Sequence, residues 1–148
     1  MTMRDSSAAR RGPCRVLTWQ ARVHQVGRSL RFPMAATFRY SAADPLAVQI
    51  VFRPPNAPQA AWHVSRDVLI SGTRVLTGVG DVRLWPVWGS GRDGQVHLRV
   101  GHPQAHALFT IDRFALIRWL SETCSLVPPG TEPELLDWDA LTKLLPDA

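Results

Sequence analysis

Short segments in which apolar and polar residues alternate recur along most of this sequence. In residues 15–24, every second position from Leu17 to Val23 is apolar, and polar residues fill the positions between them. A period of two places the two sets on opposite faces of a β-strand, so the pattern predicts a half-buried strand. The same alternation indicates further strands in residues 36–40, 48–52, 62–64, 82–87, 96–100 and 105–111.

Glycine and proline punctuate these segments and predict turns between them. The clusters lie at residues 41–45, 54–58, 78–81, 89–94 and 101–103. The last of these clusters, Gly101-His102-Pro103, is expected to join its two flanking strands in a hairpin. Pro86 interrupts an expected strand, which predicts a sheet edge or a bulge there.

Helical patterns follow each group of strands. Residues 65–70 read as a short helix with Ser65 as its N-cap and Gly72 just past its end. A longer helix is expected from the N-cap Asp112 to Val127, with apolar residues on two sides. Trp138, Leu141 and Leu145 mark a final short helix. The fold class is therefore α+β: antiparallel strands in two groups, each followed by a helix, with helices at the C-terminus.

Length and composition suit a single folded domain. The chain has 148 residues, of which 45% are hydrophobic and 20% charged, so wholesale disorder is excluded. Residues 1–14 lack any period and predict a disordered basic tail ahead of one domain at 15–148, with Met1 or Met3 as the start. No apolar run reaches 18 residues and no signal-peptide core is present, so neither membrane insertion nor export is expected.

Charge is distributed unevenly along the chain. Residues 1–40 contain eight arginines and one aspartate, whereas residues 121–148 contain six acidic residues and one lysine. A basic front predicts a polyanionic or acidic partner. Alternatively, the acidic end docks on a basic face, within the protomer or between protomers.

No pattern in the sequence predicts an active site, a cofactor or a metal. The run Gly89-Ser-Gly-Arg-Asp-Gly94 matches a dinucleotide-binding fingerprint, but a strand rather than a helix is expected after it, so a hairpin loop is favoured. His102 and His106 are separated by Pro103 in a turn, which disfavours a metal pair. The two cysteines form no disulfide framework and favour a reducing cytoplasm. We therefore expect a protein that is not an enzyme.

The polar face of the expected strands is rich in arginine and histidine. If the strands share one sheet, this face is basic and has a tryptophan nearby, which suits single-stranded nucleic acid or another anionic partner. The opposing interpretation is that the outer faces of antiparallel sheets are polar by default. The candidate partner-binding residues are Arg39, Arg53, Arg83, Arg99 and Trp85.

Four stretches together resemble the SsgA-like proteins, which are sporulation and cell-division regulators of mycelial actinomycetes. They are Arg39-Tyr-Ser-Ala-Ala-Asp-Pro-Leu-Ala-Val48, Trp62-His-Val-Ser-Arg-Asp-Val-Leu69, Thr77-Gly-Val-Gly-Asp-Val-Arg-Leu-Trp-Pro86 and Val127-Pro-Pro-Gly-Thr-Glu132. Their order and spacing agree over about residues 16–145, and Gly-Asp-Val-Arg-x-Trp-Pro is the most specific piece.

The resemblance implies a fold like that of the Whirly single-stranded nucleic-acid-binding proteins, with barrel-like sheets, and a homotrimer. It also implies a non-enzymatic role in placing, assembling or remodelling sporulation septa, through FtsZ, other divisome proteins or other SsgA-like proteins. The family supplies no ligand residues for transfer to this chain. A single-stranded nucleic-acid-binding module is the alternative function.

A trimer also has a physical motive in the sequence. Apolar residues on two sides of the 112–127 helix, together with the acidic C-terminal segment, are suited to meet the basic front of a neighbour. The expected interface residues are Phe114, Trp119 and Trp138.

Overall fold

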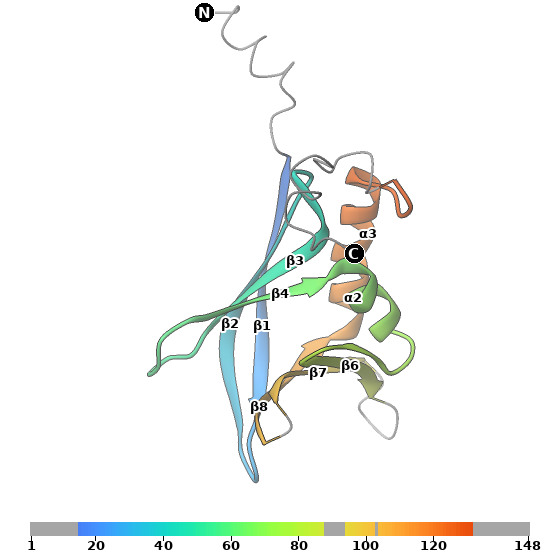
Figure 1. Ribbon diagram of the computed structural model, residues 1–148. Coiled ribbons are helices and arrows are strands. Elements are labelled where there is room, and N and C mark those ends of the chain that lie inside the picture. The colour runs from blue at the N-terminus through green and yellow to red at the C-terminus, as the bar shows by residue number, and fades with distance from the viewer. Residues whose placement is uncertain (1–14, 88–93, 103, 132–148) are drawn as a thin grey trace, which may run out of the picture.

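The computed structural model describes residues 15–87, 94–102 and 104–131. In these residues, two groups of four strands are each followed by one helix (Figure 1). The sequence predicted this order of strands and helices, but with three strands in the second group. The first group is β1 (Val16–Val26), β2 (Arg31–Ser41), β3 (Asp44–Arg53) and β4 (Ala60–Ser65), followed by α2 (Arg66–Gly72). The second is β5 (Thr77–Val79), β6 (Val82–Val87), β7 (Gln95–His102) and β8 (Ala105–Asp112), followed by α3 (Arg113–Leu126).

All eight strands belong to one antiparallel sheet with the order β4-β3-β2-β1-β8-β7-β6-β5. The two groups meet at β1 and β8, which pair only at His24–Thr110 and Gln25–Phe109. Because so short a ladder joins the groups, they diverge beyond it and the sheet curls into a half-barrel (Figure 1). Helix α2 contacts β3 and β4 of one group and β5 and β6 of the other, so it fills the hollow between them.

The core lies between the inner face of the sheet and the two helices. The alternation seen in the sequence reappears in β2, where Met34, Ala36, Phe38 and Tyr40 are buried and the residues between them are more exposed. Trp119 of α3 completes this core, because its ring lies 5.8 Å from that of Phe38 between ring centroids.

Two arginines connect the ends of α2 and α3. Arg66 begins α2, is 1% exposed, and donates from Nη1 to the backbone oxygens of Thr123 at 3.0 Å and Val127 at 2.7 Å. Arg113 begins α3 and donates from Nε to the backbone oxygen of Thr73 at 2.7 Å, just past the end of α2. The helices therefore run in opposite directions and are held together at both ends.

The expected helix caps are confirmed. The Ser65 hydroxyl accepts from the Val68 amide at 3.3 Å, and the Asp112 carboxylate accepts from the Ala115 amide at 2.9 Å. Gly72, expected beyond the helix, is instead the last residue of α2.

Several strand boundaries differ from the sequence prediction. Residues 78–81 were expected to be a turn, but β5 extends to Val79, because the chain reverses within Gly80, with φ at +59°, and Asp81. Strand β2 starts at Arg31 rather than residue 36, and β3 starts at Asp44 within the expected turn. In β2, pairing with the full length of β1 overrides the break in alternation at Pro33. The basic tail, most of the 89–94 loop and the final helix lie outside the described residues.

Candidate functional site

The predicted arginines share the outer face of one sheet, but the strand register separates them. Residues that pair across antiparallel strands lie on the same face. Trp85, His97, Thr110 and His24 form one row across β6, β7, β8 and β1. Arg83 and Arg99 pair with each other on one side of this row.

Arg53 lies on the opposite side of this row, because Ala35 pairs with both Arg53 and Arg22, two residues before His24. Arg39 pairs with Thr18 still farther along β1. The four arginines therefore occupy three different rows, and they do not form one continuous basic track.

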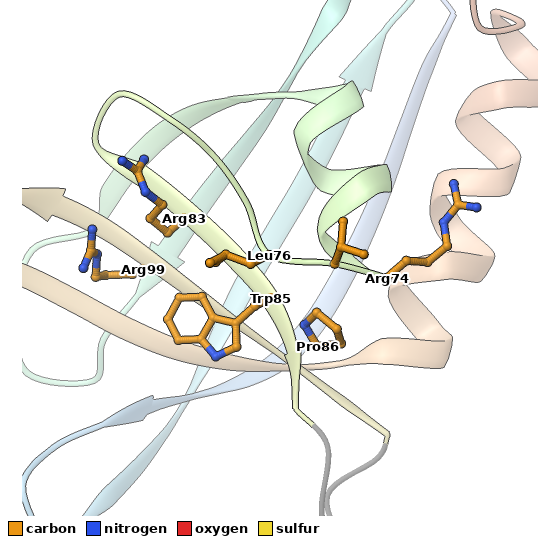
Figure 2. A pocket seen from close by; sticks show the side chains of 7 residues that line it. Arg74, Leu76, Arg83, Trp85, Pro86 and Arg99 are labelled. Carbon is orange, nitrogen blue, oxygen red and sulfur yellow. The ribbon is translucent and has the colours of Figure 1, made fainter.

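Three of the five predicted binding residues meet at one open groove, which we call the Trp85 groove (Figure 2). Its volume is about 690 Å³, and its lining consists of Arg74, Val75, Leu76, Arg83, Trp85, Pro86 and Arg99. Trp85 is half-buried and its ring lies edge-on to His97, with centroids 5.5 Å apart. Residues 74–76 were missed in the sequence because they form a connection after α2 that carries no periodic pattern.

Arg83 is held in a defined position at this groove. It faces Gly78 across the β5–β6 pair, and its Nη1 donates to the backbone oxygens of Gly80 and Val82, each at 2.9 Å. A Cβ atom on residue 78 would lie 2.3 Å from Arg83 Cδ. The Gly-x-Gly-Asp-Val-Arg run therefore has a local physical reason, because only glycine leaves room for the arginine to lie over β5.

The described residues around the groove do not neutralise its positive charges. Arg83 and Arg99 are directly opposite each other, an arrangement of like charges that is unfavourable. No ion pair within the described part of the chain involves Arg74, Arg83 or Arg99. Arg99 Nε is also buried without a hydrogen-bond partner. An anion placed here would gain both charge and hydrogen bonds.

Arg53 and Arg39 lie in other surroundings. Arg53 Nη1 donates to the Thr37 hydroxyl, which in turn donates to the side-chain oxygen of Gln20 at 2.9 Å. Arg39 borders a recess of about 60 Å³ that also contains Asp44 and His63. These two arginines are therefore separate from the Trp85 groove.

The residues expected at an oligomer interface differ in exposure. Phe114, at the start of α3, is 59% exposed, with the Arg113 guanidinium 5.6 Å from its ring centroid. Trp119 is only 4% exposed and packs against Trp19 and Phe38 within the protomer. Trp138 lies outside the described residues. The interface prediction therefore depends on Phe114.

The described residues contain no group of three or more histidine, cysteine or acidic residues arranged to hold a metal ion. His102 contacts Asp81 at 3.5 Å, next to the Gly80 turn. No described helix has the length and apolar character needed to cross a bilayer.

The architecture defines the structural class of the protein. It is an α+β protein whose single eight-stranded antiparallel sheet curls into a half-barrel around two helices. Residues 34–132 match the family model described as Streptomyces sporulation and cell division protein, SsgA. The chain belongs to the SsgA-like family, and the resemblance noted in the sequence is confirmed.

Similar proteins from actinomycetes agree with this family assignment. The sporulation-specific cell division protein SsgB of Salinispora tropica is 40% identical over 116 residues, which cover 76% of this chain and 80% of that protein. SsgB of Streptomyces coelicolor is 38% identical over 107 residues, covering 72% and 77% respectively. The chain is thus an SsgB-like sporulation-specific cell division protein, and proteins of this family are not enzymes.

Solved structures show the same fold. An SsgB structure, studied for mutations that correlate with longitudinal division in Streptomyces coelicolor sporulation, superposes with a TM-score of 0.75 at 32% identity. It covers 82% of this chain and 96% of its own. The SsgA-like sporulation-specific cell division protein of Thermobifida fusca superposes with a TM-score of 0.77 at 29% identity, covering 89% and 97%.

Proposed function

We propose that this chain is a protein-binding scaffold that acts from the cytoplasm at the septum, in septum-site placement or septum assembly. Its partners are FtsZ, other divisome proteins or other SsgA-like proteins. The observation that carries the proposal is the Trp85 groove, where two adjacent arginines with no carboxylate partner among the described residues border exposed apolar side chains. Such a surface binds other molecules, and family membership points to the division machinery.

The proposal is tested by locating and isolating the protein in sporulating hyphae. We expect a functional fluorescent fusion to form regular ladders at nascent septa, and purified protein to co-sediment with FtsZ polymers. Unpolymerised FtsZ and an unrelated basic protein of similar size serve as controls. Normal septation after deletion, together with no binding to any divisome component, would exclude the proposal.

The alternative, a single-stranded nucleic-acid-binding module, receives less support. Phosphates along a strand favour a continuous run of cations with aromatic stacking platforms. Here Arg53 and Arg99 lie on opposite sides of the His97–Thr110 row, and Arg39 is farther away. Fusion signal on nucleoids rather than septa would favour this alternative.

A homotrimer is part of the same proposal, and Phe114 is the residue that tests it. Burying an aromatic side chain that is 59% exposed favours association, and a charge in its place opposes burial. In sedimentation velocity at micromolar concentration, we expect a trimer of the 16.5 kDa chain, and smaller species for Phe114→Asp. Leu46→Asp, at a position 45% exposed on β3, is the matched control. A monomeric mass for the unmodified protein would contradict the trimer.

A further inference from the structure

The Trp85 groove combines two kinds of surface that are usually kept apart. Val75 and Leu76, on the connection between α2 and β5, line the groove and are 60% and 68% exposed. Arg83 and Arg99 lie close to these residues on the sheet, as Figure 2 shows for Leu76 and both arginines. A scattered exposed valine or leucine is ordinary, but two adjacent ones that line a groove beside Trp85 and Pro86 form an apolar patch.

The cationic part of the groove is organised in advance for an anion. The backbone oxygens of Gly80 and Val82 hold Arg83, so its side chain has already lost much of its freedom. Arg99 pairs directly with Arg83 on the neighbouring strand β7, so a second cation lies beside the first. In Figure 2, Arg74 extends away from these two arginines, so it contributes mainly its aliphatic stem. The anion site therefore consists of Arg83 and Arg99.

The groove is also next to the end of the sheet. Strand β5 is the last strand of the sheet and spans three residues, so no other described strand pairs with its outer edge. β6 continues past β5 through Trp85 to Val87, with β7 as its strand neighbour there. Short, open edges of this kind leave room for an extended chain to approach.

We propose that the Trp85 groove binds an extended, acidic segment of a partner protein. One bulky apolar side chain lies between Trp85 and Leu76, and flanking carboxylates bind Arg83 and Arg99. This inference rests on the proposed scaffold function and names the chemistry of its partner. The apolar patch favours a peptide over a nucleic acid, because a sugar-phosphate backbone gains little from exposed valine and leucine.

The test uses the full chain and a fluorescein-labelled synthetic peptide in which six acidic residues flank one leucine and one phenylalanine. We expect saturable binding by fluorescence anisotropy that weakens as salt rises. Arg83→Gln and Arg99→Gln should each weaken binding about tenfold, because each removes a charge-assisted hydrogen bond. Arg39→Gln makes the same change of charge on the outer face and should leave binding within about twofold.

Two further variants test the position of Arg83 and the apolar side of the groove. Gly78→Ala keeps every charge but displaces Arg83, and it should weaken binding nearly as much as Arg83→Gln. Leu76→Glu changes a residue that is 68% exposed, so the fold is retained while an acidic peptide is repelled. Circular dichroism melts show that each variant is folded before its affinity is compared.

Several results would overturn the proposal. One is an equal loss of binding in Arg39→Gln and Arg83→Gln. Another is equal binding of a peptide with amides in place of the carboxylates. The third is tighter binding of an unstructured oligothymidylate through the same arginines.

The scaffold function is judged separately by FtsZ co-sedimentation. If co-sedimentation persists in the Arg83→Gln, Arg99→Gln double variant, the groove proposal fails and the scaffold function stands. If the peptide binds the groove but no divisome protein binds the chain, the scaffold function fails instead.

Discussion

Replacing Arg66 with methionine is expected to lower the free energy of unfolding by about 3 kcal/mol, a large share of the stability of a single domain. Methionine fills much of the same space but has no donors. The buried Val127 oxygen then loses its bond from Nη1, whereas the Thr123 oxygen keeps the bond from the Val127 amide. The contact between the guanidinium and the Tyr40 ring, 5.0 Å from its centroid, is lost as well.

The charge of Arg66 also suits its location. The C-terminal end of a helix carries partial negative charge, and both acceptors lie at that end of α3. Arg66→Lys should therefore retain part of the stabilisation, because its ammonium keeps the charge and several donors on one nitrogen, but it loses the planar guanidinium that lies over the Tyr40 ring.

Urea denaturation monitored by tryptophan fluorescence measures this effect. The matched control is Arg118→Met, which removes an exposed arginine from α3 and should change the free energy of unfolding by less than about 0.5 kcal/mol. If the two variants had the same denaturation midpoint, the assigned role of Arg66 would be wrong.

Gly72→Ala is expected to destabilise the protein by about 2 to 3 kcal/mol, although alanine is the better helix former. Gly72 is the last residue of α2, and a Cβ there would lie 2.2 Å from Leu84 Cδ2 and 2.6 Å from Leu84 Cβ. Leu84 is fully buried on β6, and its Cβ is fixed by the strand, so α2 would have to move away from the sheet. The cost of this overpacking outweighs the gain in helix propensity.

A double-mutant cycle tests this explanation directly. Leu84→Ala alone leaves a cavity, but in the double variant the new methyl group occupies part of that space, so the two losses should not add. Gly94→Ala is the control, because its Cβ would approach only the Phe114 ring, at an ordinary 3.7 Å. Additive losses, or a Gly72→Ala variant as stable as the unmodified protein, would contradict the close packing of α2 on β6.

Arg66 and Gly72, the first and last residues of α2, also matter for the Trp85 groove. The connection that carries Val75 and Leu76 leaves directly from the end of α2, and Arg113 holds the oxygen of Thr73 at that point. Any displacement of α2 therefore moves one wall of the Trp85 groove relative to Arg83 and Arg99 on the sheet. Partner binding and stability are thus expected to be lost together in Gly72→Ala.

Local sequence patterns predicted the elements that depend on local physics. Alternation located seven of the eight described strands, and Ser65 and Asp112 located the two helix starts, because burial period and capping act within a few residues. Strand β5 was missed because three residues, one of them Gly78, carry no readable period. The buried position of Arg66 had no local signal, because its acceptors are 57 and 61 residues away in the chain.

The candidate site shows the same division. The sequence by itself determined the fold class, the polar outer face that carries Arg83, Arg99 and Trp85, and the resemblance to the SsgA-like family. Only the tertiary structure decided which arginines are neighbours. The side-chain face of a strand residue follows from its own position, but its neighbours follow from strand order and register, which are set by contacts between distant parts of the chain.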